Sequence, residues 1–240
     1  MSFVLGLIVL WLGVLRDSAR LFRLAPLIPL IAIVPEFVQH VWEVNAGMFA
    51  SKTAFHAHAM DAVRWQFGYF KIAGLWLAIL AAARFWAARR LGQPFFDRRA
   101  VAWKALGIAL LCNLAATGVI LGIGKVFPEG LAQASDLFLT VLTLPLLPLF
   151  VAPLLGIGDF TLKRAYTAGW WVALRTALVI AAWFAPLQWL HRWDHPLAMG
   201  QPLALVWGLM IWDALVVGLM AGIMGTGAHH GFVGRTDSQP

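Results

Sequence analysis

Six apolar stretches divide this sequence, each near the length of about 20 residues that a helix needs to cross a bilayer. They cover residues 24–44, 66–86, 101–124, 136–156, 170–190 and 203–225. Apolar residues make up 61% of the chain and charged residues 12%, about half the usual share of roughly 25% in soluble domains. The sequence therefore predicts an all-α polytopic membrane helix bundle with six transmembrane helices.

The basic residues fall unequally on the two sides of these predicted spans. Thirteen of the 18 Lys and Arg lie on one side: Arg16, Arg20, Arg23, Arg84, Arg89, Arg90, Arg98, Arg99, Lys104, Lys163, Arg164, Arg175 and Arg235. The other side has Lys52, Arg64, Lys71, Lys125 and Arg192. Because cytoplasmic loops carry the Lys and Arg excess, we expect a bacterial inner-membrane protein with both termini in the cytoplasm.

The N-terminal segment, residues 1–22, is expected to form an interfacial helix on the cytoplasmic side of the membrane. Its apolar part, residues 3–15, is short for a crossing. Arg16, Arg20 and Arg23 share one helical face, which is typical of a helix that lies among lipid headgroups. If residues 3–15 cross the membrane instead, the chain has seven spans and its N-terminus lies outside.

A second basic surface helix is predicted within residues 159–169, with Asp159 as its N-cap and with Lys163 and Arg164 beside an apolar face. These two side chains and the three N-terminal arginines are candidate contacts for anionic lipid headgroups. Lipid, rather than nucleic acid, is then the expected counter-charge for the net charge of +7.

Residues 1–225 are expected to form a single transmembrane domain, followed by a flexible cytoplasmic tail at residues 226–240.

The two halves of the transmembrane domain resemble each other. Segments 26–29 and 145–148 both read Pro-x-x-Pro, in the first and fourth stretches. The third and sixth stretches carry small-residue pairs at Gly118 and Gly122 and at Gly218 and Gly222. This pattern predicts a 3+3 inverted repeat, as in many secondary transporters. Alternatively, the glycine faces pack helices together, including those of a protein partner or a second copy.

Two carboxylates fall inside predicted spans, Asp213 in the sixth and Glu36 in the first. A carboxylate at the bilayer centre costs at least about 2.5 kcal/mol to insert, so each should face protein or water and have a partner. Candidate partners for Asp213 are Arg175, Lys71 and Asn113. The pair indicates either a proton or ion relay, or structural hydrogen bonds between helices.

Most of the histidines are expected on the outer side of the membrane, where several acidic residues also lie. The side chains there that could bind a metal are His40, His56, His58, His191, His195, Glu43, Asp61 and Asp194. His191 and His195 are four residues apart, a spacing that puts both on one helical face and that metal-binding pairs use. A metal site that joins them to His56, His58 and Asp61 is therefore an alternative hypothesis.

Two stretches resemble the YciC type of six-span bacterial inner-membrane proteins, a group related to the membrane domain of some glycerophosphodiester phosphodiesterases. The first is Val14-Leu-Arg-Asp-Ser-Ala-Arg-Leu-Phe22, which is similar to the amphipathic helix that precedes the first span in that group. The second, Pro148–Trp171, resembles its Pro-bearing fourth span and the short basic surface helix that follows. The resemblance implies six spans, cytoplasmic termini and a role in envelope or lipid biology. It carries over no catalytic residues.

No G-x-S-x-G, Walker or dinucleotide-binding motif occurs, and no cofactor is expected. The leading functional hypothesis is a non-enzymatic inner-membrane protein that organises or binds envelope lipid, or serves as the membrane subunit of a larger complex. The first alternative is a small secondary transporter that uses Asp213 and Glu36. The second is a periplasm-facing metal-dependent enzyme that uses the loop histidines.

Overall fold

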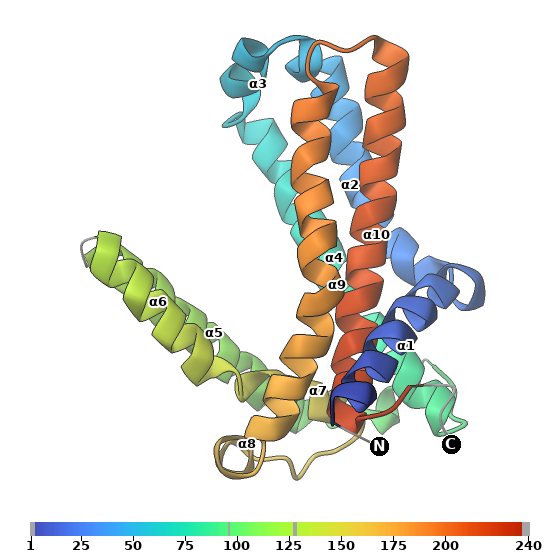
Figure 1. Ribbon diagram of the computed structural model, residues 1–240, viewed down its shortest axis with the longest axis vertical. Helices are drawn as coiled ribbons and strands as arrows, with labels where there is room; N and C mark the ends of the chain where they lie inside the picture. Colours follow the sequence, from blue (N-terminus) through green and yellow to red (C-terminus); the bar gives the residue numbers. More distant parts are fainter. Residues whose placement is uncertain (1–2, 96, 127–128, 237–240) are drawn as a thin grey trace. The chain divides into compact units, whose positions relative to one another are not determined.

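The computed structural model describes residues 3–95, 97–126 and 129–236. Residues 1–2 of the predicted surface helix and 237–240 of the predicted tail lie outside the described residues. Every regular element in the described part is helical, which confirms the all-α prediction (Figure 1). The elements are α1 (Phe3–Leu24), α2 (Leu27–Asn45), η1 (Met48–Ala50), α3 (Lys52–His58), α4 (Ala62–Arg90), η2 (Arg98–Ala100), α5 (Trp103–Val126), α6 (Glu129–Thr143), α7 (Leu146–Leu154), α8 (Leu162–Thr167), α9 (Trp170–Ala198) and α10 (Leu203–Val233).

Within the described ranges, five helices are long and apolar enough to cross a membrane: α2, α4, α5, α9 and α10. The chain is therefore built as a membrane protein. The predicted span at residues 136–156 is not one continuous helix, because the chain turns at Leu144 and Pro145 between α6 and α7. Proline has no backbone N–H and disfavours helical geometry in the residue before it, which explains the break.

The helix α1 is a single element of 22 residues and is not among the five. Four charged residues, Arg16, Asp17, Arg20 and Arg23, lie in its second half. Asp17 is buried and accepts hydrogen bonds from Arg16 and Arg20 at 3.0 Å. The predicted surface helix is thus one continuous helix.

The last helix, α10, extends to Val233, so that eight residues of the predicted tail are helical. The physical reason is close packing on α9. A Cβ at Gly231 would lie 2.6 Å from the Cα of Thr176, so only glycine allows this approach. Arg175 then donates hydrogen bonds to the carbonyls of Gly231 and Phe232 at 2.7 and 2.9 Å, which satisfies carbonyls at the end of α10.

The chain groups into two compact units. The first unit contains Met1–Leu10, Ala83–Ile180 and Gly227–Pro240, and the second contains Trp11–Ala82 and Ala181–Thr226. In the first unit, α5 contacts α6 and α7, and one apolar core includes Ala109, Leu146, Leu149, Ala152, Phe160 and Ala165. The candidate site lies in the second unit.

Two glycines let α4 and α10 approach α2 closely in the second unit. A Cβ at Gly74 of α4 would lie 2.6 Å from the carbonyl oxygen of Ile31, and one at Gly218 of α10 would lie 2.5 Å from Cγ1 of Ile33. Gly222 also lies against residues of α1. The second glycine pair of the sequence therefore packs within the chain, whereas the Gly118 and Gly122 positions meet nothing within 4 Å.

Candidate functional site

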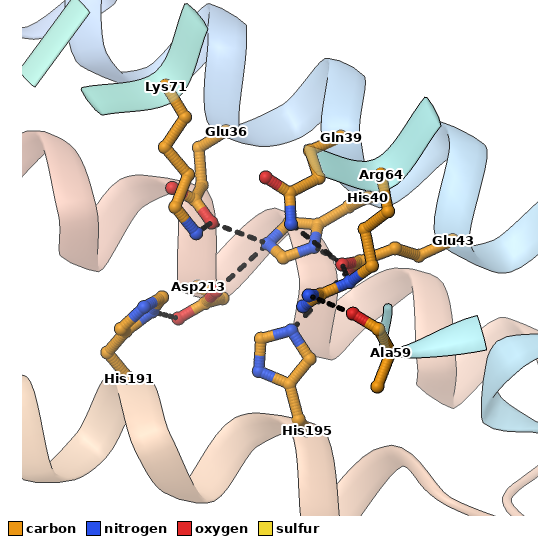
Figure 2. Close-up of polar contacts among 10 residues, drawn as sticks. All are labelled: Glu36, Gln39, His40, Glu43, Ala59, Arg64, Lys71, His191, His195 and Asp213. Atoms are coloured by element: carbon orange, nitrogen blue, oxygen red, sulfur yellow. Dashed lines mark hydrogen bonds and ion pairs between the residues drawn. The ribbon is translucent and has the colours of Figure 1, made fainter. Parts of the chain in front are cut away.

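A largely buried polar cluster in the second unit draws on four helices (Figure 2). It consists of Glu36, Gln39, His40 and Glu43 from α2, Arg64 and Lys71 from α4, His191, Asp194 and His195 from α9, and Asp213 from α10. The four residues of α2 follow the spacing i, i+3, i+4, i+7, which places them on one helical face. We call this group the polar cluster.

Two ion pairs join α2 to α4 at different depths. Arg64 Nε donates to Glu43 Oε1 and Lys71 Nζ donates to Glu36 Oε1, both at 2.8 Å. The glutamates are seven residues apart, and so are their basic partners, with the order reversed because the two helices run antiparallel. Seven residues of helix rise about 10 Å. The polar cluster therefore has two levels, the Glu43 level near the end of α2 and the Glu36 level about two turns deeper.

His40 connects the two levels. Its Nδ1 lies 2.9 Å from Glu43 Oε2 and its Nε2 lies 2.9 Å from Asp213 Oδ2, while Glu36 Oε1 lies 3.4 Å from the same Nε2. The side chain of His40 is fully buried. A neutral imidazole has one donor and one acceptor nitrogen. Two carboxylate contacts therefore require a protonated ring, a proton on one carboxyl group, or a cation at one of the nitrogens.

Asp213 contacts two histidines, one through each carboxylate oxygen. Oδ1 lies 2.6 Å from His191 Nδ1, and Oδ2 faces His40. Asp194 lies beside Asp213 as well. The carboxylate of Asp213 is fully buried, as an intramembrane acid with a partner should be.

The predicted partners of Asp213 were wrong, since each satisfies another group. Lys71 pairs with Glu36, which also shows that the two predicted intramembrane residues belong together. Arg175 binds the carbonyls of Gly231 and Phe232 described above. Asn113 donates to the carbonyl of Ala109, one turn earlier in α5, at 2.9 Å.

The outer histidines divide into two groups. His191 and His195 face α2 and join His40, whereas His58 Nδ1 lies 2.6 Å from Asp61 Oδ2 on a partly exposed surface and His56 is exposed on α3. In the described part of the chain, two sets of three residues bring potential metal-ligand atoms within 4.8 Å of one another. They are His40, Glu43 and His195, and Glu36, His191 and Asp213. The predicted His56, His58 and Asp61 belong to neither.

The polar cluster contains more carboxylates than basic side chains. Four carboxylates, Glu36, Glu43, Asp194 and Asp213, face two basic side chains, Arg64 and Lys71, which leaves two negative charges if all the histidines are neutral. Within the described residues, four buried polar atoms of the cluster have no hydrogen-bond partner: Glu36 Oε2, Gln39 Oε1, Asp194 Oδ2 and His195 Nε2. An orphaned buried acceptor costs roughly 1–3 kcal/mol, so these atoms mark places where a cation would be stabilised.

The five basic residues that were predicted to contact lipid headgroups lie outside the polar cluster. Arg23 and Lys163 are exposed, and Arg164 pairs with exposed Asp159 at 3.3 Å. Arg16 and Arg20 are held by Asp17. The predicted N-cap of α8 was wrong, because Thr161 and not Asp159 accepts the backbone N–H of Arg164. Thr161 is in extended geometry directly before the helix, as an N-cap requires.

Sequence reasoning missed the roles of Gln39 and Arg64 and the link between the intramembrane acids and the histidines. One signal was available, because Glu36 and Glu43 share a seven-residue spacing with Arg64 and Lys71. On two antiparallel neighbouring helices that spacing predicts two ion pairs on facing surfaces.

Comparisons with known proteins add no functional assignment to this geometry. The chain matches no family model, no curated protein and no solved structure. The function must therefore be argued from the polar cluster itself.

Proposed function

We propose that this protein is a small secondary transporter and that the polar cluster is its cation-binding site. The observation that carries the proposal is that four buried carboxylates, Glu36, Glu43, Asp194 and Asp213, share only two basic partners, Arg64 and Lys71, in membrane-crossing helices. Carboxylates at membrane depth are costly, and in known membrane proteins they mark ion and proton pathways. A structural role alone would be served by ion pairs that balance.

The depth of the cluster supports this function. Glu36 precedes the end of α2 by nine residues, Lys71 follows the start of α4 by nine residues, and Asp213 follows the start of α10 by ten residues. At 1.5 Å per residue, these positions lie about 14 Å from the helix ends, close to half of a hydrocarbon core of about 30 Å. Secondary transporters bind their ions and substrates near this depth. The Glu43 level then leads from the membrane surface toward it.

We also propose six spans, with α6 and α7 together as the fourth crossing in chain order and both termini in the cytoplasm, in keeping with the resemblance to YciC-type proteins. The inverted repeat is supported by a local likeness, because Pro26 and Pro145 occupy the N-cap positions of α2 and α7 with similar helical backbone angles. A phosphatase reporter after Pro240 should be inactive, since the enzyme needs the periplasm. The same reporter inserted after Gly200, in the turn between α9 and α10, should be active. The opposite pattern would contradict this topology.

The transport proposal is tested in proteoliposomes that contain a pH-sensitive dye. Inward gradients of Na⁺, K⁺, Mn²⁺ and Zn²⁺ are imposed one at a time, and the internal pH is recorded. We expect at least one cation to drive proton flux in the unmodified protein. Asp213→Asn and Glu36→Gln should abolish this flux, whereas Asp159→Asn, which changes an exposed acid, should leave it intact. Absence of flux with every cation, or equal flux in Asp213→Asn, would contradict the proposal.

A lipid-binding role has separate support at α8. Its exposed Lys163 and Arg164 adjoin exposed Leu162, while Phe160 anchors the segment in the core of the first unit. A surface helix with basic and apolar side chains favours contact with anionic headgroups. This role is compatible with transport, because the two sets of residues do not overlap.

A further inference from the structure

We propose that His40, Glu43 and His195 bind a divalent first-row transition-metal cation, such as Zn²⁺ or Mn²⁺. This inference rests on the proposed function and names the class of cation that the same cluster takes. The sequence-based metal hypothesis placed His195 with His56, His58 and Asp61, which lie elsewhere. The proposed ligands come from two helices, α2 and α9.

The three potential ligand atoms lie within 4.8 Å of one another. Glu43 Oε2 lies 2.9 Å from His40 Nδ1 and 3.6 Å from His195 Nε2. In a tetrahedral zinc site with bonds of about 2.0–2.1 Å, neighbouring ligand atoms are about 3.3 Å apart. The two observed separations lie on either side of that value, so shifts of a few tenths of an ångström would place the Glu43 carboxylate at the ligand distance from both imidazoles.

The carboxylate of Glu43 is oriented for this task by its other oxygen. Oε1 accepts hydrogen bonds from Gln39 Nε2 and Arg64 Nε, both at 2.8 Å. These donors fix the plane of the carboxylate and leave Oε2 directed between the two imidazoles (Figure 2). Ligating carboxylates in metal sites are held by hydrogen bonds of this kind.

His40 has the outer partner that metal-binding histidines usually have. With Nδ1 as the ligand atom, Nε2 carries the proton and donates to Asp213 Oδ2 at 2.9 Å. A carboxylate behind the second ring nitrogen fixes the tautomer and the orientation of the ring and strengthens it as a ligand. This arrangement also resolves the double carboxylate contact of His40, because the metal takes the place of a second proton.

His195 supplies the independent observation that a ligand is expected. Its Nε2 is buried and lacks a hydrogen-bond partner among the residues that the structure describes. The ring is held in place by Phe49, which stacks on it at 5.7 Å between centroids, and by the edge of Phe55 at 6.0 Å. This nitrogen is positioned by aromatic rings and lies 3.6 Å from Glu43 Oε2, just beyond hydrogen-bond distance, so it is arranged as a metal ligand.

The ligand types select the class of cation. Two imidazoles and one carboxylate suit zinc, iron, manganese and related ions, whereas Mg²⁺ and Ca²⁺ prefer oxygen ligands throughout. With the histidines neutral, a divalent ion would also balance the excess of carboxylates over basic side chains in the polar cluster. We therefore expect selectivity for transition metals over Mg²⁺ and Ca²⁺.

The test is metal binding by the purified full-length protein in detergent. The protein is equilibrated with Zn²⁺, passed over a desalting column and analysed for bound metal, and the affinity is measured by competition with a chelator. We expect His195→Gln and Glu43→Gln to bind one equivalent less Zn²⁺ than the unmodified protein. We expect Gln39→Leu, which removes only an outer contact, to weaken affinity by about 10–100-fold. The matched control is His56→Gln, which should bind like the unmodified protein.

Two results would overturn the inference: His195→Gln that binds Zn²⁺ like the unmodified protein, or Ca²⁺ that competes equally. If the Glu43 variant fails to fold, the absorption spectrum of Co²⁺ bound to the unmodified protein shows whether the metal has nitrogen ligands. Intense bands of four- or five-coordinate Co²⁺ with nitrogen ligands support the site, and the faint spectrum of hexaaquo-like Co²⁺ contradicts it.

The outcomes also separate this inference from the transport proposal. Metal binding that depends on His195, without any cation-driven flux, supports the metal site and contradicts transport. Flux of Na⁺ or K⁺ that His195→Gln leaves unchanged supports transport and contradicts the metal site.

Discussion

His40 and Asp213 are 173 residues apart in the chain, yet His40 Nε2 lies 2.9 Å from Asp213 Oδ2 in a fully buried position. This contact joins the first helix of the predicted bundle to the last. It also joins two residues that had been assigned to different groups by sequence, an outer histidine and an intramembrane acid. The polar cluster depends on this contact, because Asp213 reaches α9 through His191 as well.

Asp213→Asn should destabilise the protein. An amide has one acceptor atom where the carboxylate has two, so either His40 or His191 would face an N–H₂ group. Leaving one buried partner unsatisfied costs about 1–3 kcal/mol. We expect a loss of this size in the free energy of unfolding, measured by denaturant titration in mixed micelles. Asp159→Asn, at a side chain that is 80% exposed, should change it by less than about 0.5 kcal/mol.

The pair Lys71–Glu36 should show strong energetic coupling. Removing one partner of a buried ion pair costs roughly 3–5 kcal/mol of the free energy of unfolding. Because the side chain of Lys71 is 24% exposed, we expect the loss in Lys71→Met to lie near the lower end of that range. The double variant with Glu36→Gln should recover part of that loss, since no unpaired charge remains. A double-mutant cycle of unfolding free energies measures the coupling. Additive losses would show that the two side chains do not interact in the membrane.

Gly74→Ala should separate α4 from α2. The added methyl group would lie 2.6 Å from the backbone oxygen of Ile31, which cannot move aside as a side chain can. We expect a cost of about 1–3 kcal/mol and a weakened Lys71–Glu36 contact, because Lys71 lies one turn from Gly74. Gly68→Ala is the matched control in the same helix. It meets nothing within 4 Å and should be neutral or stabilising by up to about 1 kcal/mol.

Some of this architecture could be predicted from sequence because it depends on local properties. Span length, the apolar character of α2, α4, α5, α9 and α10 and the presence of an acid at Asp213 follow from composition along the chain. The break at Pro145 could also have been predicted, because proline has no backbone N–H. It was missed because a hydropathy pattern is averaged over many residues and does not show a single turn. The extension of α10 to Val233 could not be predicted from the sequence, because it depends on close contact between Gly231 and Thr176.

The polar cluster was only half predictable for a related reason. Sequence could identify Asp213, Glu36, Lys71, His191 and His195 as unusual residues at membrane depth or on one face. It could not pair them, because rotation of each helix about its axis decides which side chains meet. That rotation is set by contacts such as Gly218 against Ile33, where the absence of a side chain brings α10 onto α2.

The basic side chains of α8 should retain anionic lipid. Each Lys or Arg near an anionic surface contributes about 1 kcal/mol, which corresponds to roughly a fivefold change in affinity. Lys163→Gln combined with Arg164→Gln should therefore reduce the phosphatidylglycerol that remains bound through purification, as measured by native mass spectrometry. Lys52→Gln, on exposed α3, serves as the control. Equal lipid retention in all three proteins would show that α8 does not bind headgroups.

The most direct test of the account is to locate a bound cation. Crystals grown with Mn²⁺ and measured with X-rays at the manganese absorption edge reveal the ion by its anomalous signal. The account predicts a peak inside the polar cluster, between His40, Glu43 and His195, and none in crystals of His195→Gln. Peaks found only outside the polar cluster, with His40 and Asp213 still in contact, would contradict it.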